Sequence, residues 1–143
     1  MAAEARLRAL STAARDAGNT YAARQYAVLE QQVTALRQLA ADDLDGAVAA
    51  AKNAAEMERE YLRVPSGPPK PMKPAAELYA DVLLAANRPQ EAIAAYGQSL
   101  EWIPQRTPSM RGLAMAAERA GDQATADEMN ARLRSMPGAA LMD

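Results

Sequence analysis

The acidic residues of this chain are the first candidates for chemistry. The stretch from Ala41 to Gly46 reads Ala-Asp-Asp-Leu-Asp-Gly, which contains the carboxylates and the glycine of a calcium-binding loop. A loop of that kind needs an oxygen ligand at its first position and a bidentate acid at its twelfth, and these positions hold Ala41 and Lys52. We therefore predict that the stretch caps the start of a helix instead, where Asp side chains accept hydrogen bonds from free backbone N–H groups.

A second acidic pair, Glu77 and Asp81, has the spacing of one helical turn and could act as paired carboxylates. Catalysis or metal binding there would need a base, a nucleophile or a third ligand, and the sequence contains neither His nor Cys. The same absence excludes disulfides, thiol catalysis and the common zinc sites. We therefore predict a protein that is not an enzyme, with no catalytic residues, no metal site and no cofactor.

The overall charge argues against nucleic acid as a partner. Lys and Arg number 16 against 18 Asp and Glu, giving a formal net charge of −2, and no basic stripe stands out. No apolar run approaches the roughly 20 residues that a membrane span requires, and the charged N-terminus does not resemble a signal peptide. We expect a soluble chain without membrane contacts, cytoplasmic by default, and the sequence leaves open whether it is a fragment of a longer protein.

Apolar periodicity and helix-end residues predict seven helices. Alanine, the strongest helix former, makes up about a quarter of the residues. Gly18, Asn87 and Gly121 stand where helices should stop, and Pro89 and Pro108 stand where helices should start. The predicted helices cover about 2–17, 21–40, 44–62, 74–86, 89–103, 107–120 and 123–136.

The second of these helices has the clearest apolar spacing. Its apolar residues recur at intervals of four and three, which makes a clean helical stripe. The fifth helix is predicted to bury Ile103. The residues of the stripe on the second helix are Ala22, Tyr26, Leu29, Val33, Leu36 and Ala40.

A proline-rich segment over 64–74 separates the third and fourth helices. Proline removes backbone donors and disfavours helix in the preceding residue, so we predict an extended surface connection, with Pro74 starting the next helix. The alternative is that 68–71, Pro-Pro-Lys-Pro, is a ligand for an aromatic groove in another protein. Residues 137–143 are predicted to be a frayed tail.

Two predicted turns are each followed by an alanine, and the distance between these alanines along the chain indicates a repeat. Ala92 and Ala126 lie 34 positions apart, and each is the small residue just inside the second helix of a predicted hairpin. A period near 34 is typical of helical hairpins that stack on their neighbours. The alternative, a generic Ala-rich bundle, gives no reason for the turn and the small residue to repeat.

These two segments, 74–104 and 107–136, resemble tetratricopeptide repeats. The resemblance implies an all-α fold of antiparallel helical hairpins stacked as a short right-handed superhelix. The second segment departs from the pattern at Asn130, where an aromatic residue is expected, and at Pro137, which comes one residue early. The matching residues are Tyr79, Ala80, Leu83, Ala92, Tyr96 and Pro104 in the first segment, and Leu113, Ala114, Gly121, Asp122 and Ala126 in the second.

A third, degenerate hairpin is predicted over 20–63. The run from Asp45 to Val48 resembles the run from Gln90 to Ile93, and the excess spacing between them equals the length of the proline-rich segment. An extra N-terminal helix over 1–18 would complete a single all-helical domain over 1–143.

The resemblance also implies a function, because family members usually bind protein partners in the concave groove lined by the first helix of each hairpin. We expect a non-enzymatic scaffold or adaptor that binds a protein or peptide, either an amphipathic helix or an extended segment. Acids in the middle hairpin disfavour a peptide C-terminal carboxylate as the ligand. The implied groove residues are Gln32, Leu36, Leu39, Glu77, Asp81, Leu84, Arg111, Met115 and Glu118.

Two alternatives remain open at the level of sequence. The first helix could fold back and fill the groove itself. The chain could also be a structural or self-association module, a homo-oligomer or the C-terminal part of a larger protein. The odd number of helices favours this second alternative, because one helix lacks a hairpin partner.

Overall fold

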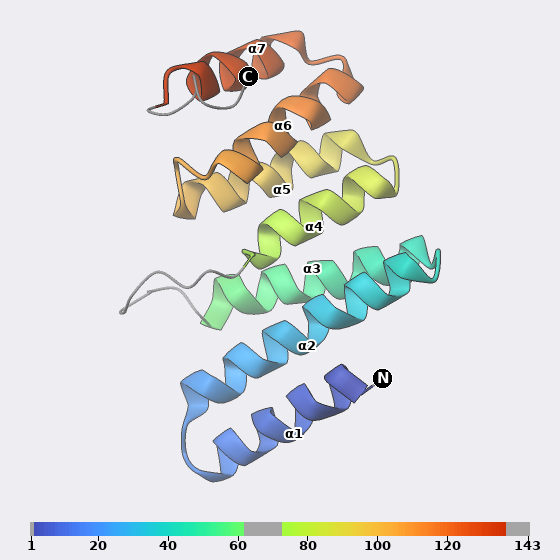
Figure 1. The fold of residues 1–143 in the computed structure, drawn as a ribbon, viewed down its shortest axis with the longest axis vertical. Coiled ribbons are helices and arrows are strands. Elements are labelled where there is room, and N and C mark those ends of the chain that lie inside the picture. The colour runs from blue at the N-terminus through green and yellow to red at the C-terminus, as the bar shows by residue number, and fades with distance from the viewer. Residues whose placement is uncertain (1, 62–72, 137–143) are drawn as a thin grey trace.

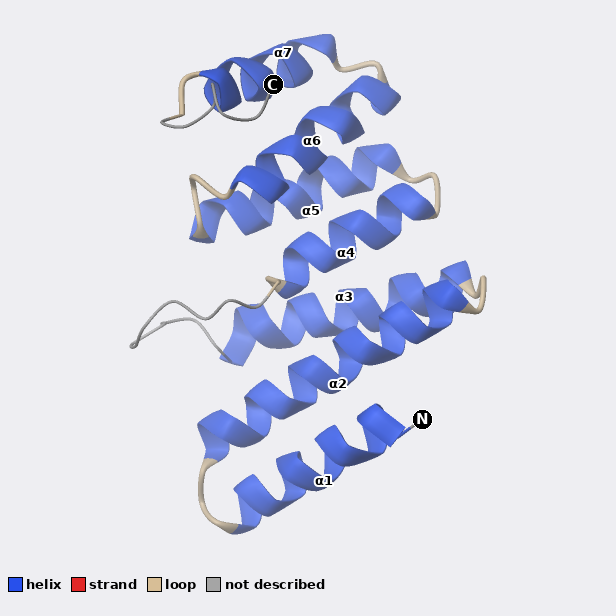
Figure 2. Ribbon diagram, viewed as in Figure 1, coloured by secondary structure: helices blue, strands red, loops and turns tan. Residues whose placement is uncertain are grey.

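The computed structural model describes residues 2–61 and 73–136, and these residues form helices and short turns without a strand. The proline-rich stretch over 64–72 and the tail over 137–143 lie outside the described residues. Figures 1 and 2 show the helices following one another up a single elongated stack. The helices are α1 (Ala2–Asp16), α2 (Thr20–Ala40), α3 (Leu44–Tyr61), α4 (Ala75–Ala85), α5 (Pro89–Trp102), α6 (Thr107–Ala120) and α7 (Gln123–Arg134).

The same turn joins α2 to α3, α4 to α5 and α6 to α7. Each turn contains one residue in the left-handed region, namely Asp42 (φ 60°), Asn87 (φ 56°) and Gly121 (φ 79°). The N–H of the following residue donates to the carbonyl five positions back, which satisfies an orphan group at the helix end. These bonds are 2.9 Å long and run from Asp43 to Gln38, from Arg88 to Leu83 and from Asp122 to Ala117.

The predicted cap at Ala41–Gly46 is confirmed. The Asp43 carboxylate accepts a hydrogen bond of 3.0 Å from the backbone N–H of Gly46, in the first turn of α3. Asp122 caps α7 in the same way through the N–H of Thr125, at 3.1 Å. The acidic stretch therefore starts a helix, and among the described residues no group of three or more His, Cys, Asp or Glu could hold a metal ion.

The helices form two rows. Each helix packs against the next one in the chain, and in addition α2 touches α4 and α4 touches α6. Within the described ranges α1 does not touch α3, α3 does not touch α5, and α5 does not touch α7. This arrangement is that of stacked helical hairpins in which the first helices form one continuous row. The handed superhelix implied by the family resemblance remains a prediction.

Small residues let the helices of each hairpin approach closely. Ala92 and Ala126, the two alanines of the repeated spacing, are both fully buried. The main core cluster joins α2 to α7 and contains many alanine methyl groups together with Leu78, Leu83 and Tyr96. A core built from methyl groups is thin, so its stability depends on close contact between helix backbones.

Enlarging either of these alanines should therefore destabilise the protein. We expect Ala92→Leu and Ala126→Leu each to lower the free energy of unfolding by about 1–3 kcal/mol, because the extra atoms force the paired helices apart. The measurement is urea unfolding followed by circular dichroism. Ala94→Leu is the control, since Ala94 is exposed on the same helix as Ala92. Unchanged midpoints for both buried variants would show that close packing at these positions is unimportant.

The apolar stripe of α2 is not the side of this helix that is buried. The interior residues of α2 are Ala23, Val28, Gln32 and Ala35, whereas Leu36 is 50% exposed. The helix packs against α1, α3 and α4. The sides of α2 that make these contacts are not the side that carries the apolar stripe. Ile103 was also predicted to be buried, but it lies beyond the end of α5 and is 44% exposed.

Candidate functional site

A buried ion pair joins α4 to the start of α6. The side chain of Glu77 is only 2% exposed. Arg106, the residue before α6, donates from Nε to Oε2 at 2.5 Å and from Nη2 to Oε1 at 2.9 Å, so the pair is bidentate. The hydroxyl of Ser109 also donates to the Glu77 carboxylate, and Ser99 of α5 lies 2.9 Å from the Ser109 hydroxyl. Three helices thus share one hydrogen-bonded cluster.

The Glu77 carboxylate is charged in this cluster. Burial favours its protonated form, but the hydrogen bonds from Arg106 and Ser109 and the charges of Arg106 and Lys73 outweigh burial. The pKa of Glu77 is therefore held below its ordinary value of 4.5. The hydrogen bond to Glu77 raises the pKa of Arg106, so both partners are ionised at neutral pH.

Lys73, Asp81 and Tyr96 continue this cluster toward the surface. The Lys73 ammonium pairs with the Asp81 carboxylate and lies 3.8 Å from Glu77 Oε1. The Tyr96 hydroxyl donates to the same Asp81 carboxylate. Burial, the hydrogen bond to Asp81 and the Asp81 charge all raise the pKa of Tyr96, so its phenol remains protonated. Each acid in the cluster is already held by a cation and a hydroxyl group, which suits a structural tie between helices.

Three of the nine predicted groove residues are buried, so they offer little surface to a partner. Glu77 lies in the cluster, and Gln32 donates from Nε2 to the Lys73 carbonyl at 3.0 Å. Leu84 is 8% exposed and belongs to the core. The physical reason is that the first helices of successive hairpins, α2, α4 and α6, contact one another. Where α2 meets α4 and α4 meets α6, the facing side chains become interior.

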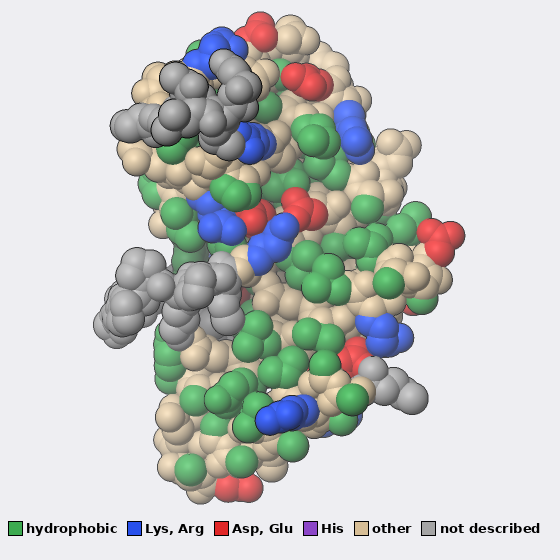
Figure 3. Space-filling view, in the orientation of Figure 1, with side chains coloured by type: hydrophobic (Ala, Val, Ile, Leu, Met, Phe, Trp, Pro, Cys, Tyr) green, Lys and Arg blue, Asp and Glu red, His purple; other side chains and the backbone are tan. Residues whose placement is uncertain are grey.

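The other six predicted groove residues keep some access to solvent. Leu36 and Met115 are 50% and 46% exposed, Arg111 and Glu118 are exposed, and Leu39 and Asp81 are half-exposed. Figure 3 views the molecule from the side of α2 and α6, and shows hydrophobic side chains gathered over α2 and charged side chains nearer the middle.

The alternative in which the first helix fills this face is wrong, because α1 packs against α2 alone among the described helices.

Sequence reasoning did not assign Lys73 and Arg106 to this site. Both stand outside the predicted helices, in the connections that precede α4 and α6, so no helical spacing links them to Glu77 or Asp81. Arg106 is 29 residues from its partner Glu77 along the chain. Burial of Glu77 would have been the only signal, because a buried carboxylate needs a cation nearby.

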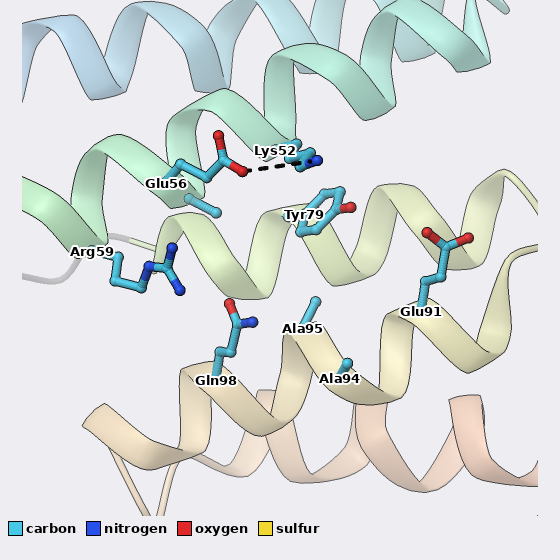
Figure 4. Close-up of a pocket in the computed structure, with 9 residues that line it drawn as sticks. Lys52, Glu56, Arg59, Tyr79, Glu91, Ala94, Ala95 and Gln98 are labelled. Atoms are coloured by element: carbon cyan, nitrogen blue, oxygen red, sulfur yellow. Dashed lines mark ion pairs between the residues drawn. The ribbon is translucent and has the colours of Figure 1, made fainter.

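A shallow cleft lies on another side of the molecule, between α3 and α5, with Tyr79 of α4 at its base (Figure 4). It encloses about 260 Å³. Its charged groups are largely paired, because Lys52 lies 3.8 Å from Glu56 and Glu91 is held at 2.6 Å by Arg88. The cleft therefore offers no convergent set of polar groups for a small ligand.

No family model matches this chain, and no curated protein matches its sequence significantly. No helix within the described residues combines the length and the apolar character needed to cross a membrane.

Proposed function

We propose that this protein is a non-enzymatic scaffold or adaptor that binds a protein or peptide on the surface formed by α4 and α6. We call this surface the α4–α6 face, and it comprises Lys73, Asp81, Arg111, Met115 and Glu118. The near balance of charge over the whole chain supports a protein partner over nucleic acid.

Met115 carries this proposal. It is a large apolar side chain that is 46% exposed in the middle of α6. Arg111 lies one turn before it and Glu118 one turn after it, so the three share one side of the helix. An apolar anchor between opposite charges suits a peptide that presents an apolar side chain flanked by polar ones. The family resemblance supports the same face, because first helices of hairpins line the binding groove in that family.

The test is Met115→Arg, compared with Gln98→Arg as a matched control. Gln98 is exposed on α5 beside the cleft, away from the α4–α6 face. A partner identified with the wild-type chain by cross-linking should bind Met115→Arg at least about tenfold more weakly, by calorimetry. Both variants should keep the wild-type melting temperature. Equal affinity of the two variants for that partner would place the binding site elsewhere.

A structural or self-association module is the second candidate function. The observation that favours it is the apolar stripe of α2, which is only partly covered in the structure.

A further inference from the structure

The helix α1, at one end of the stack (Figure 1), lies outside the apolar core. Neither core cluster of the described residues contains a side chain of α1, whose only buried residue is Ser11. Leu10 is 40% exposed, and Leu7 and Ala14 are half-buried. At the other end of the stack, α7 contributes the buried Met129 to the main core cluster. Since burial of apolar side chains is the main stabilising contribution in folding, α1 is held less firmly than α7.

The side of α2 that faces α1 is small and polar. Its residues that bond to α1 follow one another at intervals of 7, 4 and 3, so they share one side of the helix. They are Ala23, Glu30, Thr34 and Arg37. None of these four has a large apolar side chain, so this side of α2 offers α1 little hydrophobic area to bury.

Ion pairs hold α1 against α2 instead. Glu4 accepts from Arg37 Nε at 3.0 Å and from the Thr34 hydroxyl at 2.8 Å. These hydrogen bonds hold the pKa of Glu4 below its ordinary value of 4.5, so its pair with Arg37 is ionic at neutral pH. Arg8 donates from Nη2 to Glu30 at 2.6 Å. The Arg8 and Arg37 side chains are 74% and 49% exposed, so dissolved salt screens both pairs.

We propose that α1 is a detachable end helix, which leaves α2 as a unit while α2–α7 stay folded, and that ionic strength controls how often it does so. The main core cluster joins α2 to α7 without α1, so it stays packed when α1 leaves. Detachment uncovers the side of α2 that carries Ala23, and α1 therefore acts as a lid over this end of the stack. The α4–α6 face is unchanged by detachment, because α1 touches α2 alone among the described helices, so the lid does not depend on the proposed partner binding.

Thiol labelling of the full chain tests the detachment, and the chain has no native cysteine to interfere. Ser11 is 5% exposed, and its hydroxyl donates to the Ala23 carbonyl at 2.8 Å, so a thiol at this position is covered until α1 leaves. Ser99 of α5 is the matched control, since it is 3% exposed and lies 2.9 Å from the Ser109 hydroxyl of α6. Ser11→Cys should react at least about tenfold faster than Ser99→Cys. Equal rates would mean that α1 opens only with the whole chain, and would overturn the proposal.

Salt tests the ionic control. Raising NaCl from about 0.01 M to about 1 M shortens the Debye length from about 30 Å to about 3 Å, and should speed the labelling of Ser11→Cys about threefold or more, without this effect on Ser99→Cys. At low salt, adding Glu4→Gln to Ser11→Cys should speed labelling about twofold to fivefold. Glu91→Gln, which breaks the surface pair with Arg88 on α5, is the control and should change nothing. A labelling rate of Ser11→Cys that ignores both salt and Glu4→Gln would overturn the ionic control.

Hydrogen exchange of the wild-type chain distinguishes detachment of the whole helix from fraying of its end. An isolated helix of 15 residues is marginal in water, so all the amides of α1 lose protection together when it leaves. The amides over 6–16 should therefore exchange at least about tenfold faster than those of α7, and faster still in about 1 M NaCl. Fast exchange confined to 2–5, with the rest of α1 as slow as α7, would show fraying alone and would overturn the proposal.

Discussion

Glu77→Gln is expected to lower the free energy of unfolding by about 2–4 kcal/mol, one of the largest effects of any polar substitution in this chain. The reason is that the wild-type carboxylate accepts both N–H groups of Arg106 and the hydroxyl of the buried Ser109. A neutral amide cannot accept all of these bonds, so a partly buried guanidinium and a buried hydroxyl lose their partners. Urea unfolding at pH 7 measures the change.

A surface pair in the same protein provides a matched control. Arg88 and Glu91 form the same bidentate geometry, with both nitrogen–oxygen distances at 2.6 Å, but the Glu91 side chain is 51% exposed. Glu91→Gln should therefore lower the free energy of unfolding much less than Glu77→Gln, because water replaces the lost bonds. If Glu77→Gln cost no more than Glu91→Gln, burial would not be what makes the Glu77 pair important.

The difference between wild type and Glu77→Gln should also depend on pH. Because the folded-state pKa of Glu77 lies below 4.5, its carboxylate contributes stability above the unfolded pKa. That contribution is lost as the pH falls through the folded pKa, when the folded protein must also take up the proton. The free energies of unfolding of the two proteins should therefore approach each other as the pH falls below 4.5. A constant difference from pH 7 to pH 3 would contradict a lowered pKa.

Local residues were sufficient to predict the helices and turns. Asn87, Gly121 and Pro89 have backbone preferences that depend little on distant neighbours, and each one marks a helix end in the structure. The acidic stretch that contains Asp43 was also predicted to cap a helix from its neighbours alone, and Asp43 accepts the expected hydrogen bond. The all-helical class follows from this local information.

The packing of the helices could not be predicted from the same information. The apolar stripe of α2 predicts correctly that Val33 and Leu36 share one side, but burial depends on which helices lie beside that side. Glu77 was placed on the open surface because its partner Arg106 stands in a distant turn whose position only the folded chain defines. Periodicity describes the surface of one helix, whereas burial is a property of several helices together.

The effect of a substitution at Gly112 also depends on the side chains that pack against its helix. Its sequence context is an ordinary helix, where alanine normally stabilises by about 0.5–1 kcal/mol relative to glycine. In the structure, a Cβ atom on Gly112 would overlap the ring of Tyr96. That ring is 2% exposed, and its hydroxyl is held by Asp81. We therefore expect Gly112→Ala to destabilise the protein by about 1–3 kcal/mol, measured by urea unfolding.

Gly97 makes this prediction specific to the contact with Tyr96. It also lies inside a helix, α5, but a Cβ atom there would have no neighbour within 4 Å. Gly97→Ala should therefore stabilise by up to about 1 kcal/mol, which is the opposite sign from Gly112→Ala. Combining Gly112→Ala with Tyr96→Leu should cost less than the sum of the two single changes, because removing the ring makes room for the methyl group. Strict additivity of the two changes would mean that Gly112 is required for a reason other than the approach of Tyr96.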